Sequence, residues 1–403
     1  MKKLIAVIGS GWGDEGKGLT TDYFANQLQT GYVVRFNSGA QAAHTVQLDD
    51  GTRHVFSHFG SGTFVGLPTV LGEHFVVNPL LFQKEREELF ALGYTPKVYV
   101  HENCMVTTPY DMIVNQLLET LRGDDRHGSC GVGFNETIER HETYPQLSTR
   151  VHEISDILVG WSFLVRQLEC IRSEWLRSRT SITKDFLSNP IVRDLVEAYN
   201  STKLFNDYIK SWDYFLETIE IIPNYDLLND DNVILEGAQG LQLDQNSGNF
   251  PNVTRSNTGI KNVIEIVNQL KDPNQLDVVY VSRCYTTKHG AGNLPFEEEF
   301  PEHLKDVDQT NKPNEFQGTL RYAPLNLHEF FKVTMRDIDT IIEDDVKYLI
   351  KISTMFTCLD QKPTDIIVGN KHSVLTEEEF EKNIIKLTNY VSYGPTRSTI
   401  KAL

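Results

Sequence analysis

A glycine-rich segment near the start of the chain carries two carboxylates and a lysine. It reads Gly-Ser-Gly-Trp-Gly-Asp-Glu-Gly-Lys-Gly over residues 9–18, directly after the apolar run 4–8. Glycines let the backbone approach a phosphate and point N–H groups at it, and Lys17 adds a positive charge. Residues 11–17 match the GxxxxGK spacing of a P-loop, but Gly18 stands where a Ser or Thr would hold magnesium.

A pair of carboxylates inside a phosphate-binding turn calls for a chemical explanation. Asp14 and Glu15 would repel a bound phosphate. Asp14 is therefore predicted to act as a base, or as a magnesium ligand that offsets the repulsion. The alternative is an ordinary tight turn without a ligand.

The sequence supplies a strand before this loop and a helix after it. Residues 4–8 predict the strand, and a helical pattern begins at about Leu19. Further strands are predicted at 32–36, 97–100, 232–235, 276–281, 348–352 and 365–368, and helices at 79–92 and 109–121. This alternation is typical of an α/β fold with a large, mostly parallel central sheet flanked by helices.

Residues 151–222 differ from the rest of the chain, with little glycine and continuous helical periodicity. They predict a helical subdomain inserted into the sheet protein. Trp161, Trp175 and Trp212 lie in it and are expected in its core, with a subunit interface as the alternative. No linker rich in proline, glycine or serine separates independent domains, so residues 1–403 are predicted to form one unit.

Composition excludes several classes of protein. With 40% hydrophobic and 23% charged residues the chain has an ordinary globular composition, and its net charge of −17 repels nucleic acids. No apolar run approaches the ~18 residues of a membrane span, and the first one is too short for a signal peptide. The five scattered cysteines without a CxxC pair argue for a reducing, cytoplasmic location and against structural zinc.

Six blocks, in order along the chain, resemble motifs of the adenylosuccinate synthetase family. Residues 9–18 resemble its Gly-x-x-Trp-Gly-Asp-Glu-Gly-Lys-Gly signature, and residues 38–45 its Gly-Gly-x-Asn-Ala-Gly-His-Thr block. Residues 235–240 contain its Glu-Gly-Ala-Gln-Gly, and residues 250–258 resemble its Tyr-Pro-x-Val-Thr-Ser-Ser-Asn-Thr. Residues 290–292 and 392–395 fit later blocks. The resemblance covers nearly the whole chain and implies the P-loop-like fold of that family.

The family joins L-aspartate to a 6-oxopurine nucleotide through a 6-phosphoryl intermediate, using a nucleoside triphosphate. The resemblance implies that Asp14 removes the purine N1 proton and that His44 is a general acid. It implies that Lys17 and Mg²⁺ stabilise the transferring phosphoryl group and that Gln239 reads the purine 6-oxygen. Asp14 and the backbone carbonyl of Ala43 would hold the Mg²⁺.

The same resemblance assigns further binding residues. The purine nucleotide is expected at Gly13, Glu15, Gly16, Gly18, Gln41, Ser129, Arg140, Leu243 and Thr254, with Ser129 and Thr254 on its 5′-phosphate. The triphosphate is expected at Lys351, Ser353, Ser392, Gly394 and Pro395, and aspartate at Thr319 and Arg321. Arg140 is expected to reach the nucleotide of a neighbouring subunit, which implies a homodimer; a solvated helix charge is the alternative. His127 and His289, in glycine-rich loops, are further candidates.

The stretch aligned with the guanine-reading block departs from the common pattern. The family reads the guanine of GTP with the aspartate of a Lys-Leu-Asp block, which is placed here at residues 350–354. Ser353 would then stand in place of the aspartate. A serine cannot accept both guanine hydrogens, so ATP is expected as the phosphoryl donor.

Two other stretches also depart from the pattern. The arginine-rich aspartate loop is shortened to residues 314–322, which keep Arg321 as a bidentate clamp. An arginine that lies near the nucleotide 2′-hydroxyl in the family is missing. A deoxynucleotide would therefore lose less binding free energy, relative to a ribonucleotide, than in the common enzyme. Ala40 and Gln41 replace the usual pair before His44 and alter the purine pocket.

Together these departures resemble the phage diaminopurine branch of the family, the 2-aminodeoxyadenylosuccinate synthases, which use dGMP in place of IMP. The expected reaction joins L-aspartate to dGMP with ATP and gives N6-succinyl-2-amino-2′-deoxyadenylate, ADP and phosphate, in the host cytoplasm if the chain is phage-encoded. Asp14 is retained, where some members of that branch carry serine. The alternatives are the same ligation on IMP with GTP or ATP, a P-loop-like NTPase switch, and an inactive nucleotide-binding scaffold.

Overall fold

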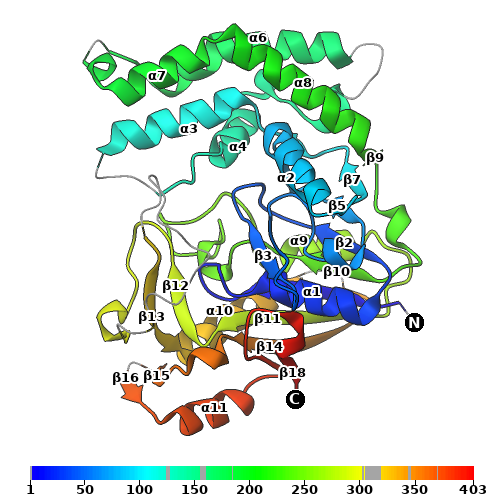
Figure 1. Ribbon diagram of the computed structural model, residues 1–403, viewed down its shortest axis with the longest axis vertical. Coiled ribbons are helices and arrows are strands. Elements are labelled where there is room, and N and C mark those ends of the chain that lie inside the picture. Colours follow the sequence, from blue (N-terminus) through cyan, green and yellow to red (C-terminus); the bar gives the residue numbers. More distant parts are fainter. Residues whose placement is uncertain are drawn as a thin grey trace.

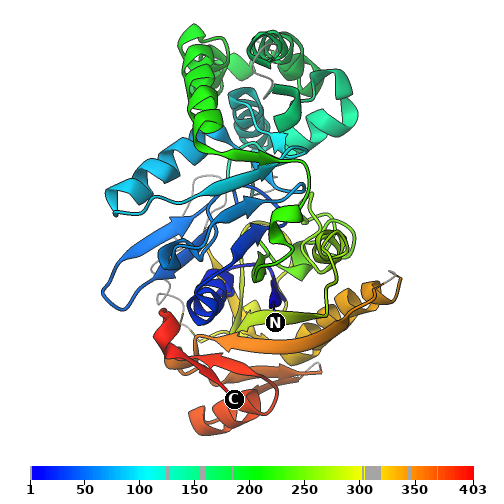
Figure 2. The ribbon, with the colours of Figure 1, turned by 90° about the vertical axis from the view of Figure 1, so that its right-hand side faces the viewer.

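A mostly parallel sheet runs through the centre of the molecule (Figures 1 and 2). The computed structural model describes residues 2–123, 128–154, 160–183, 185–301, 304, 319–343, 346–369 and 371–403. Within these residues the sheet has ten strands, in the spatial order β18 (Ile400–Ala402), β17 (Tyr390–Ser392), β14 (Leu349–Thr357), β11 (Gln275–Arg283), β1 (Leu4–Gly9), β10 (Val233–Glu236), β2 (Tyr32–Arg35), β5 (Thr69–Leu71), β7 (Val98–His101) and β9 (Glu220–Ile222). Only the β17–β18 pair of this described sheet is antiparallel.

Helices cover both faces of the sheet, so its central strand is buried along its whole length. Ile5 and Val7 of β1 pack in one apolar cluster with α1 (Lys17–Leu28). The alternate residues of β1 pack in another cluster with α9 (Lys261–Val267) and α10 (Leu327–Asp339). The carboxyl end of β1 therefore delivers the glycine-rich loop at a fixed place on the sheet edge.

Smaller sheets flank the central one. In the described part of the chain they are β12 (Tyr285–Lys288), β13 (Arg321–Asn326), β15 (Asp365–Val368) and β16 (Lys371–Val374) in one sheet, β3 (His44–Gln47) with β4 (Arg53–Phe56), and β6 (Val76–Val77) with β8 (Met105–Val106). The helix α11 (Glu377–Ile385) packs against β15 through Phe380 and Ile384 and lies at the bottom of Figure 1.

A layer of helices lies beyond the β7–β9 end of the sheet, at the top of Figure 1. It contains α2 (Pro79–Ala91), α3 (Pro109–Arg122), α4 (Phe134–Thr143), α5 (Val151–Ile154), α6 (Gly160–Arg179), α7 (Pro190–Tyr199) and α8 (Thr202–Thr218). Most of these helices share one apolar core, in which Trp175 and Trp212 are buried. The helices expected over 151–222 thus pack with α3 and α4, which precede them. Trp161 is 57% exposed, so its expected place in the core is wrong.

The structure confirms the α/β fold class and the predicted mostly parallel sheet. One boundary matters for function: β14 continues to Thr357, well past the predicted strand at 348–352. Among the described residues no helix is both long and apolar enough to span a bilayer. The five cysteines all lie in described parts of the chain and are free thiols.

Arg140 lies inside the helical layer, completely buried. Its Nε and Nη2 donate to the two carboxylate oxygens of Asp111 at 2.9 and 2.8 Å, and Nη2 also donates to the Val106 carbonyl at 3.0 Å. Its Nη1 donates to the Thr149 hydroxyl at 3.2 Å. The prediction that Arg140 reaches a neighbouring subunit's nucleotide is therefore wrong, because its guanidinium joins α3 to α4. The homodimer stays a proposal without this support.

Replacing Arg140 with methionine should lower the free energy of unfolding by about 3–5 kcal/mol, because Asp111 would keep a buried charge without its partner. Arg193→Met, on the exposed side of α7, is the control and should change it by less than about 0.5 kcal/mol. Urea unfolding followed by circular dichroism measures both. Equal stability of the two variants would contradict a structural role for Arg140.

Candidate active site

A cavity of about 740 Å³ lies at the carboxyl ends of β1, β10, β11 and β14. Open parallel sheets bind ligands at this edge, where loops from several strands meet. Most of the predicted site residues line it: Gly13, Asp14, Glu15, Gly16, Lys17, Gly18, Gln41, Ala43, His44, Gln239, Leu243, Gly394 and Pro395.

Glu15 holds the glycine-rich loop together. One of its carboxylate oxygens accepts the backbone N–H of Gly11, and the other lies 3.1 Å from Nζ of Lys17. Both charged side chains are buried. Burial raises the pKa of Glu15, although the charge of Lys17 and the Gly11 hydrogen bond oppose the rise. Both oxygens are therefore engaged, and Glu15 positions Lys17 for a ligand.

Gly18 is a steric requirement of this site. A Cβ atom at this position would lie 2.9 Å from Cβ of His44 and 3.1 Å from the carbonyl oxygen of Thr45. A serine or threonine of a standard P-loop cannot fit there without moving β3. The departure from the P-loop pattern therefore follows from the close approach of His44.

Asp14 is a carboxylate held ready for a ligand. Its Oδ2 lies 3.1 Å from Nε2 of His289, and Nε of Arg283 donates to its backbone carbonyl. Burial raises the pKa of Asp14, but the hydrogen bond from His289 and the charges of His289, Arg283 and Lys17 outweigh burial, so the pKa is lowered. Asp14 is therefore ionised at neutral pH. Its other oxygen, Oδ1, is the one that can contact a bound purine ring.

His44 forms a buried pair with Glu236, the last residue of β10. Nδ1 of His44 lies 2.6 Å from Oε1 of Glu236, which also accepts the Ser61 hydroxyl at 2.5 Å, while Oε2 accepts the Ser61 N–H at 2.9 Å. Burial lowers the pKa of His44 to about 4, so the ring is neutral. Because Nδ1–H donates to Glu236, Nε2 is left as a buried acceptor without a partner on the cavity side. Sequence reasoning quoted Glu236 within a motif but missed its role.

Gln239 and Gln41 meet at Ser38. The Ser38 hydroxyl donates to Oε1 of Gln239 at 3.1 Å and accepts Nε2 of Gln41 at 2.6 Å. The Gln239 amide nitrogen is then available to an oxo group in the cavity. Asn37 exchanges two hydrogen bonds with the backbone of Ala238, which fixes the Gln239 turn against the end of β2.

The structure contradicts the prediction that Ser353 contacts the base of the triphosphate. Ser353 pairs in register with Val279, which itself pairs with Val7, so it sits deep in the sheet and is only 5% exposed. Neither Ser353 nor the exposed Lys351 lines the cavity.

The end of this strand and the turn after it do reach the cavity, through Thr357, Cys358, Asp360 and Gln361. Cys358-Leu359-Asp360 matches the Lys-Leu-Asp pattern at two of three positions. Asp360 thus brings to the cavity a carboxylate that the sequence analysis did not single out. The longer strand β14 is the reason for the shift.

Six other predicted residues lie outside the lining of this cavity, and two of them are the buried Arg140 and Arg321 of β13. Ser392 donates to the Gly394 carbonyl at 2.6 Å, and Thr254 donates through its N–H to the Leu243 carbonyl at 2.7 Å, so both support residues that line the cavity. Ser129 donates to Oδ1 of Asn115 at 2.8 Å, and Thr319 is exposed. His127 and the loop residues 314–318 lie outside the described residues.

A further cavity of about 460 Å³ adjoins the first, since Trp12, Gly13 and Glu15 line both. Lys288 of β12 also lines it. Arg321, predicted to bind aspartate, lies opposite Lys288 in the antiparallel β12–β13 register.

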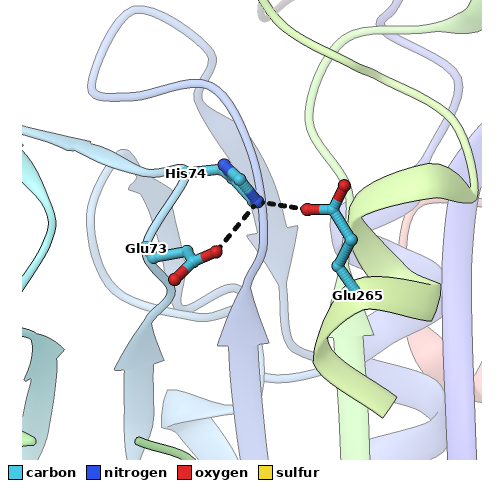
Figure 3. Close-up of side chains that lie close together, drawn as sticks. All are labelled: Glu73, His74 and Glu265. Carbon is cyan, nitrogen blue, oxygen red and sulfur yellow. Dashed lines mark hydrogen bonds and ion pairs between the residues drawn. The ribbon is translucent and has the colours of Figure 1, made fainter. Parts of the chain in front are cut away.

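Figure 3 shows another polar cluster, formed by Glu73, His74 and Glu265. None of these residues lines either cavity. Nε2 of His74 lies 2.7 Å from a carboxylate oxygen of Glu265 and 3.3 Å from one of Glu73. Within the described residues this is the one group of three such side chains close enough to share a metal ion. Its contacts join the segment after β5 to α9, and it shares no residue with the candidate active site.

Comparison with known proteins decides the family. The adenylosuccinate synthetase family model matches residues 6–319. The chain belongs to the adenylosuccinate synthetase family. It is therefore an enzyme, a carbon–nitrogen ligase of the type that joins aspartate to a purine nucleotide.

Curated relatives agree with this assignment. The adenylosuccinate synthetase of Limosilactobacillus reuteri is 30% identical over 372 residues, covering 91% of this chain and 78% of the relative. That of Lactobacillus acidophilus is 28% identical over 341 residues, covering 82% and 73%.

Solved structures share the fold. Fully ligated adenylosuccinate synthetase from Plasmodium falciparum has a TM-score of 0.74 at 16% identity, covering 100% of both chains. Cyanophage S-2L succinoaminodeoxyadenylate synthetase (PurZ), bound to dGMP and dATP, has a TM-score of 0.59 at 15% identity, covering 100% of this chain and 95% of that one. At such identities these likenesses show the fold alone, so the expected phage branch stays a proposal.

The buried His44 should make folding stability depend on pH. Its folded pKa of about 4 lies below the ordinary value of 6.5, so the unfolded chain binds the proton first as the pH falls. Its contribution to stability is complete above pH 6.5 and is lost towards pH 4. Between pH 7.5 and 5.0 the free energy of unfolding should fall in both proteins. The fall should be smaller by about 2 kcal/mol in His44→Asn than in the wild type.

Urea unfolding at both pH values measures this difference. His328→Asn, an exposed histidine on α10, is the control and should keep the wild-type dependence. If His44→Asn loses as much stability as the wild type, the neutral buried state of His44 is refuted.

Proposed function

We propose that this ligase joins L-aspartate to carbon 6 of IMP, with GTP as the phosphoryl donor. One observation carries the proposal. A carboxylate, a lysine, a neutral histidine and a free amide donor, from Asp14, Lys17, His44 and Gln239, line one cavity at the carboxyl edge of the sheet.

The purine end of the reaction needs a base. Hypoxanthine loses its N1 proton to Asp14, and the negative charge moves to the 6-oxygen, which Gln239 meets with its amide N–H. The lowered pKa keeps Asp14 ionised and ready to accept the proton. The 6-oxygen then attacks the γ-phosphorus, and the bond from that phosphorus to the bridging oxygen of GDP breaks.

The phosphoryl end needs positive charge. Lys17 is buried beside Glu15 and faces the cavity with its remaining N–H groups. Nε2 of His44 is neutral in the empty site, and a phosphate anion beside it favours a proton there, which is the form a general acid needs. Glu236 stabilises that imidazolium through Nδ1.

A magnesium ion fits these residues. Asp14 offers a carboxylate and Ala43 a backbone carbonyl to the same cavity, and Mg²⁺ prefers such oxygens together with phosphates and water. When bound, the ion would neutralise charge on the phosphates. In the last step the amine of aspartate attacks carbon 6, and the 6-oxygen leaves as inorganic phosphate.

Asp360 supports GTP as the donor. A carboxylate accepts the N1 and 2-amino hydrogens of guanine together, which no adenine edge offers. Asp360 follows the end of β14 and lines the same cavity as Gly394 and Pro395. ATP was expected because Ser353 was thought to contact the base of the triphosphate. Ser353 does not line the cavity, so that reason no longer holds.

His289 supports IMP as the acceptor. Guanine offers two hydrogens on the edge that carries N1, and hypoxanthine offers one. Oδ2 of Asp14 already faces His289 at 3.1 Å. The two lone pairs of Oδ1 then serve the magnesium ion and the purine N1–H, which leaves no acceptor for a 2-amino hydrogen. A second candidate is dGMP, which is the nucleotide in the cyanophage PurZ structure. Residues 314–322 contain Arg321 as their single arginine, so a missing 2′-hydroxyl costs little there.

Phosphate release should identify the substrates. The assay combines IMP, GMP or dGMP with GTP or ATP and L-aspartate, and IMP with GTP should give the highest kcat/KM. Asp14→Asn should lower kcat by about 10²-fold or more while nucleotide binding, followed by calorimetry, persists. A higher kcat/KM with dGMP selects the second candidate, and release without aspartate contradicts the ligation.

Asp360 should set the choice of donor. Asp360→Asn removes one paired acceptor, so the ratio of kcat/KM for GTP over ATP should fall by about 10- to 100-fold. Ser353→Ala is the matched control and should leave the ratio unchanged. The reverse pattern would restore the sequence-based placement at Ser353.

A further inference from the structure

Three metal-binding atoms converge between α9 and the segment that follows β5 (Figure 3). Glu73 and His74 lie between β5 and β6, and Glu265 lies on α9. Nε2 of His74 is 2.7 Å from Oε2 of Glu265 and 3.3 Å from Oε1 of Glu73. One ring nitrogen thus lies between two carboxylates, and a single proton on it can serve only one of them well.

The two carboxylates have no cationic partner of their own. Within the described ranges, neither Glu73 nor Glu265 has a lysine or arginine at ion-pair distance. His74 can offset at most one of the two negative charges, and histidine is largely uncharged near pH 7. The cluster therefore attracts a cation.

A buried histidine is aimed at the cluster from the sheet. His101, the last residue of β7, is only 2% exposed, and its Nδ1 accepts the Asn103 N–H at 3.2 Å. The ring proton is then on Nε2, which points to Oε2 of Glu73 at 3.8 Å, a distance too long for a hydrogen bond. A small movement of Glu73 would complete the bond that commonly orients a carboxylate on a metal ion.

The spacing of these atoms fits zinc. With bonds of about 2.1 Å, the ligands of a tetrahedral zinc ion lie about 3.4 Å apart. The 3.3 Å between His74 and Glu73 already matches, and Glu265, which is 40% exposed, needs to move by less than about 1 Å. A nitrogen beside two carboxylate oxygens favours such an ion over Mg²⁺, which prefers oxygen alone.

We infer that Glu73, His74 and Glu265 bind a divalent transition-metal ion such as Zn²⁺, with water as the fourth ligand. The site shares no residue with the candidate active site and does not depend on the proposed function. The scattered cysteines argue against a thiolate zinc site, and this site has no cysteine among its ligands.

The ion would tie together two segments that hold the purine side of the active site. The backbone N–H two residues after His74 donates to the Ser38 carbonyl at 2.8 Å. One turn before Glu265, Nδ2 of Asn262 donates to the Phe36 carbonyl at 3.3 Å. The hydroxyl of Ser38 joins the two glutamines of the cavity. A bound ion therefore stabilises the folded arrangement of residues 36–38.

Titration of the metal-free protein with Zn²⁺ tests the site, in competition with a fluorescent zinc chelator and without nucleotide or Mg²⁺. Glu265→Gln removes one ligand at an exposed position, so zinc affinity should fall by at least about tenfold. Glu378→Gln, an exposed glutamate of α11, is the matched control and should keep the wild-type affinity. Equal affinities of the wild type and Glu265→Gln overturn the inference.

Asp14→Asn separates this site from the candidate magnesium site. It removes a carboxylate from the cavity and should leave the zinc affinity of the remaining site unchanged. Loss of the tightest bound zinc in Asp14→Asn would place that ion in the cavity and overturn the inference.

Urea unfolding gives an independent measurement. Zinc that binds the folded chain should raise the urea midpoint of the wild type. His74→Gln should abolish this rise, whereas His328→Gln, at an exposed position on α10, should keep it. No rise in the wild type, or a rise that persists in His74→Gln, contradicts the site.

Discussion

Three carboxylates in or behind the candidate active site are each held by a basic side chain or a histidine from another part of the loop or the chain. Glu15 is paired with Lys17, Glu236 with His44 and Asp14 with His289. This balance matters because the whole protein carries a net charge of −17 and its site must accept phosphates. Without its partner, a buried carboxylate would have a raised pKa, or its charge would destabilise the folded site. The pairs therefore prepare the cavity for anions before any ligand arrives.

Local patterns in the sequence predicted the part of the site that lies on one segment. The glycine-rich loop follows a strand and precedes a helix, so its place at the sheet edge follows from spacing alone. The His44–Glu236 pair joins residues 192 positions apart, and nothing local to either residue indicates it. His44 was found from its motif, whereas Glu236 needed the register of β10 beside β2.

The errors in sequence interpretation have physical causes. Ser353 was placed at the donor site because residues 350–354 were matched to the family's Lys-Leu-Asp block, but this stretch lies inside β14, which continues to Thr357. A residue in the middle of a parallel strand cannot reach the carboxyl edge, whatever its motif. Arg140 was misassigned because a sequence does not show whether an arginine meets a carboxylate such as Asp111 inside a helical layer. Burial of charge is decided by partners that lie far along the chain.

A chain of contacts links Asp14 to β13. Asp14 faces His289, and the next residue, Gly290, accepts a hydrogen bond through its carbonyl from Nη1 of Arg321. The same Nη1 donates to the carbonyl of Gly292, so Arg321 holds both glycines of the segment that follows His289. Arg321 is itself held by the carboxylate of Glu297. The contact that lowers the pKa of Asp14 therefore depends on a strand far along the chain from the glycine-rich loop.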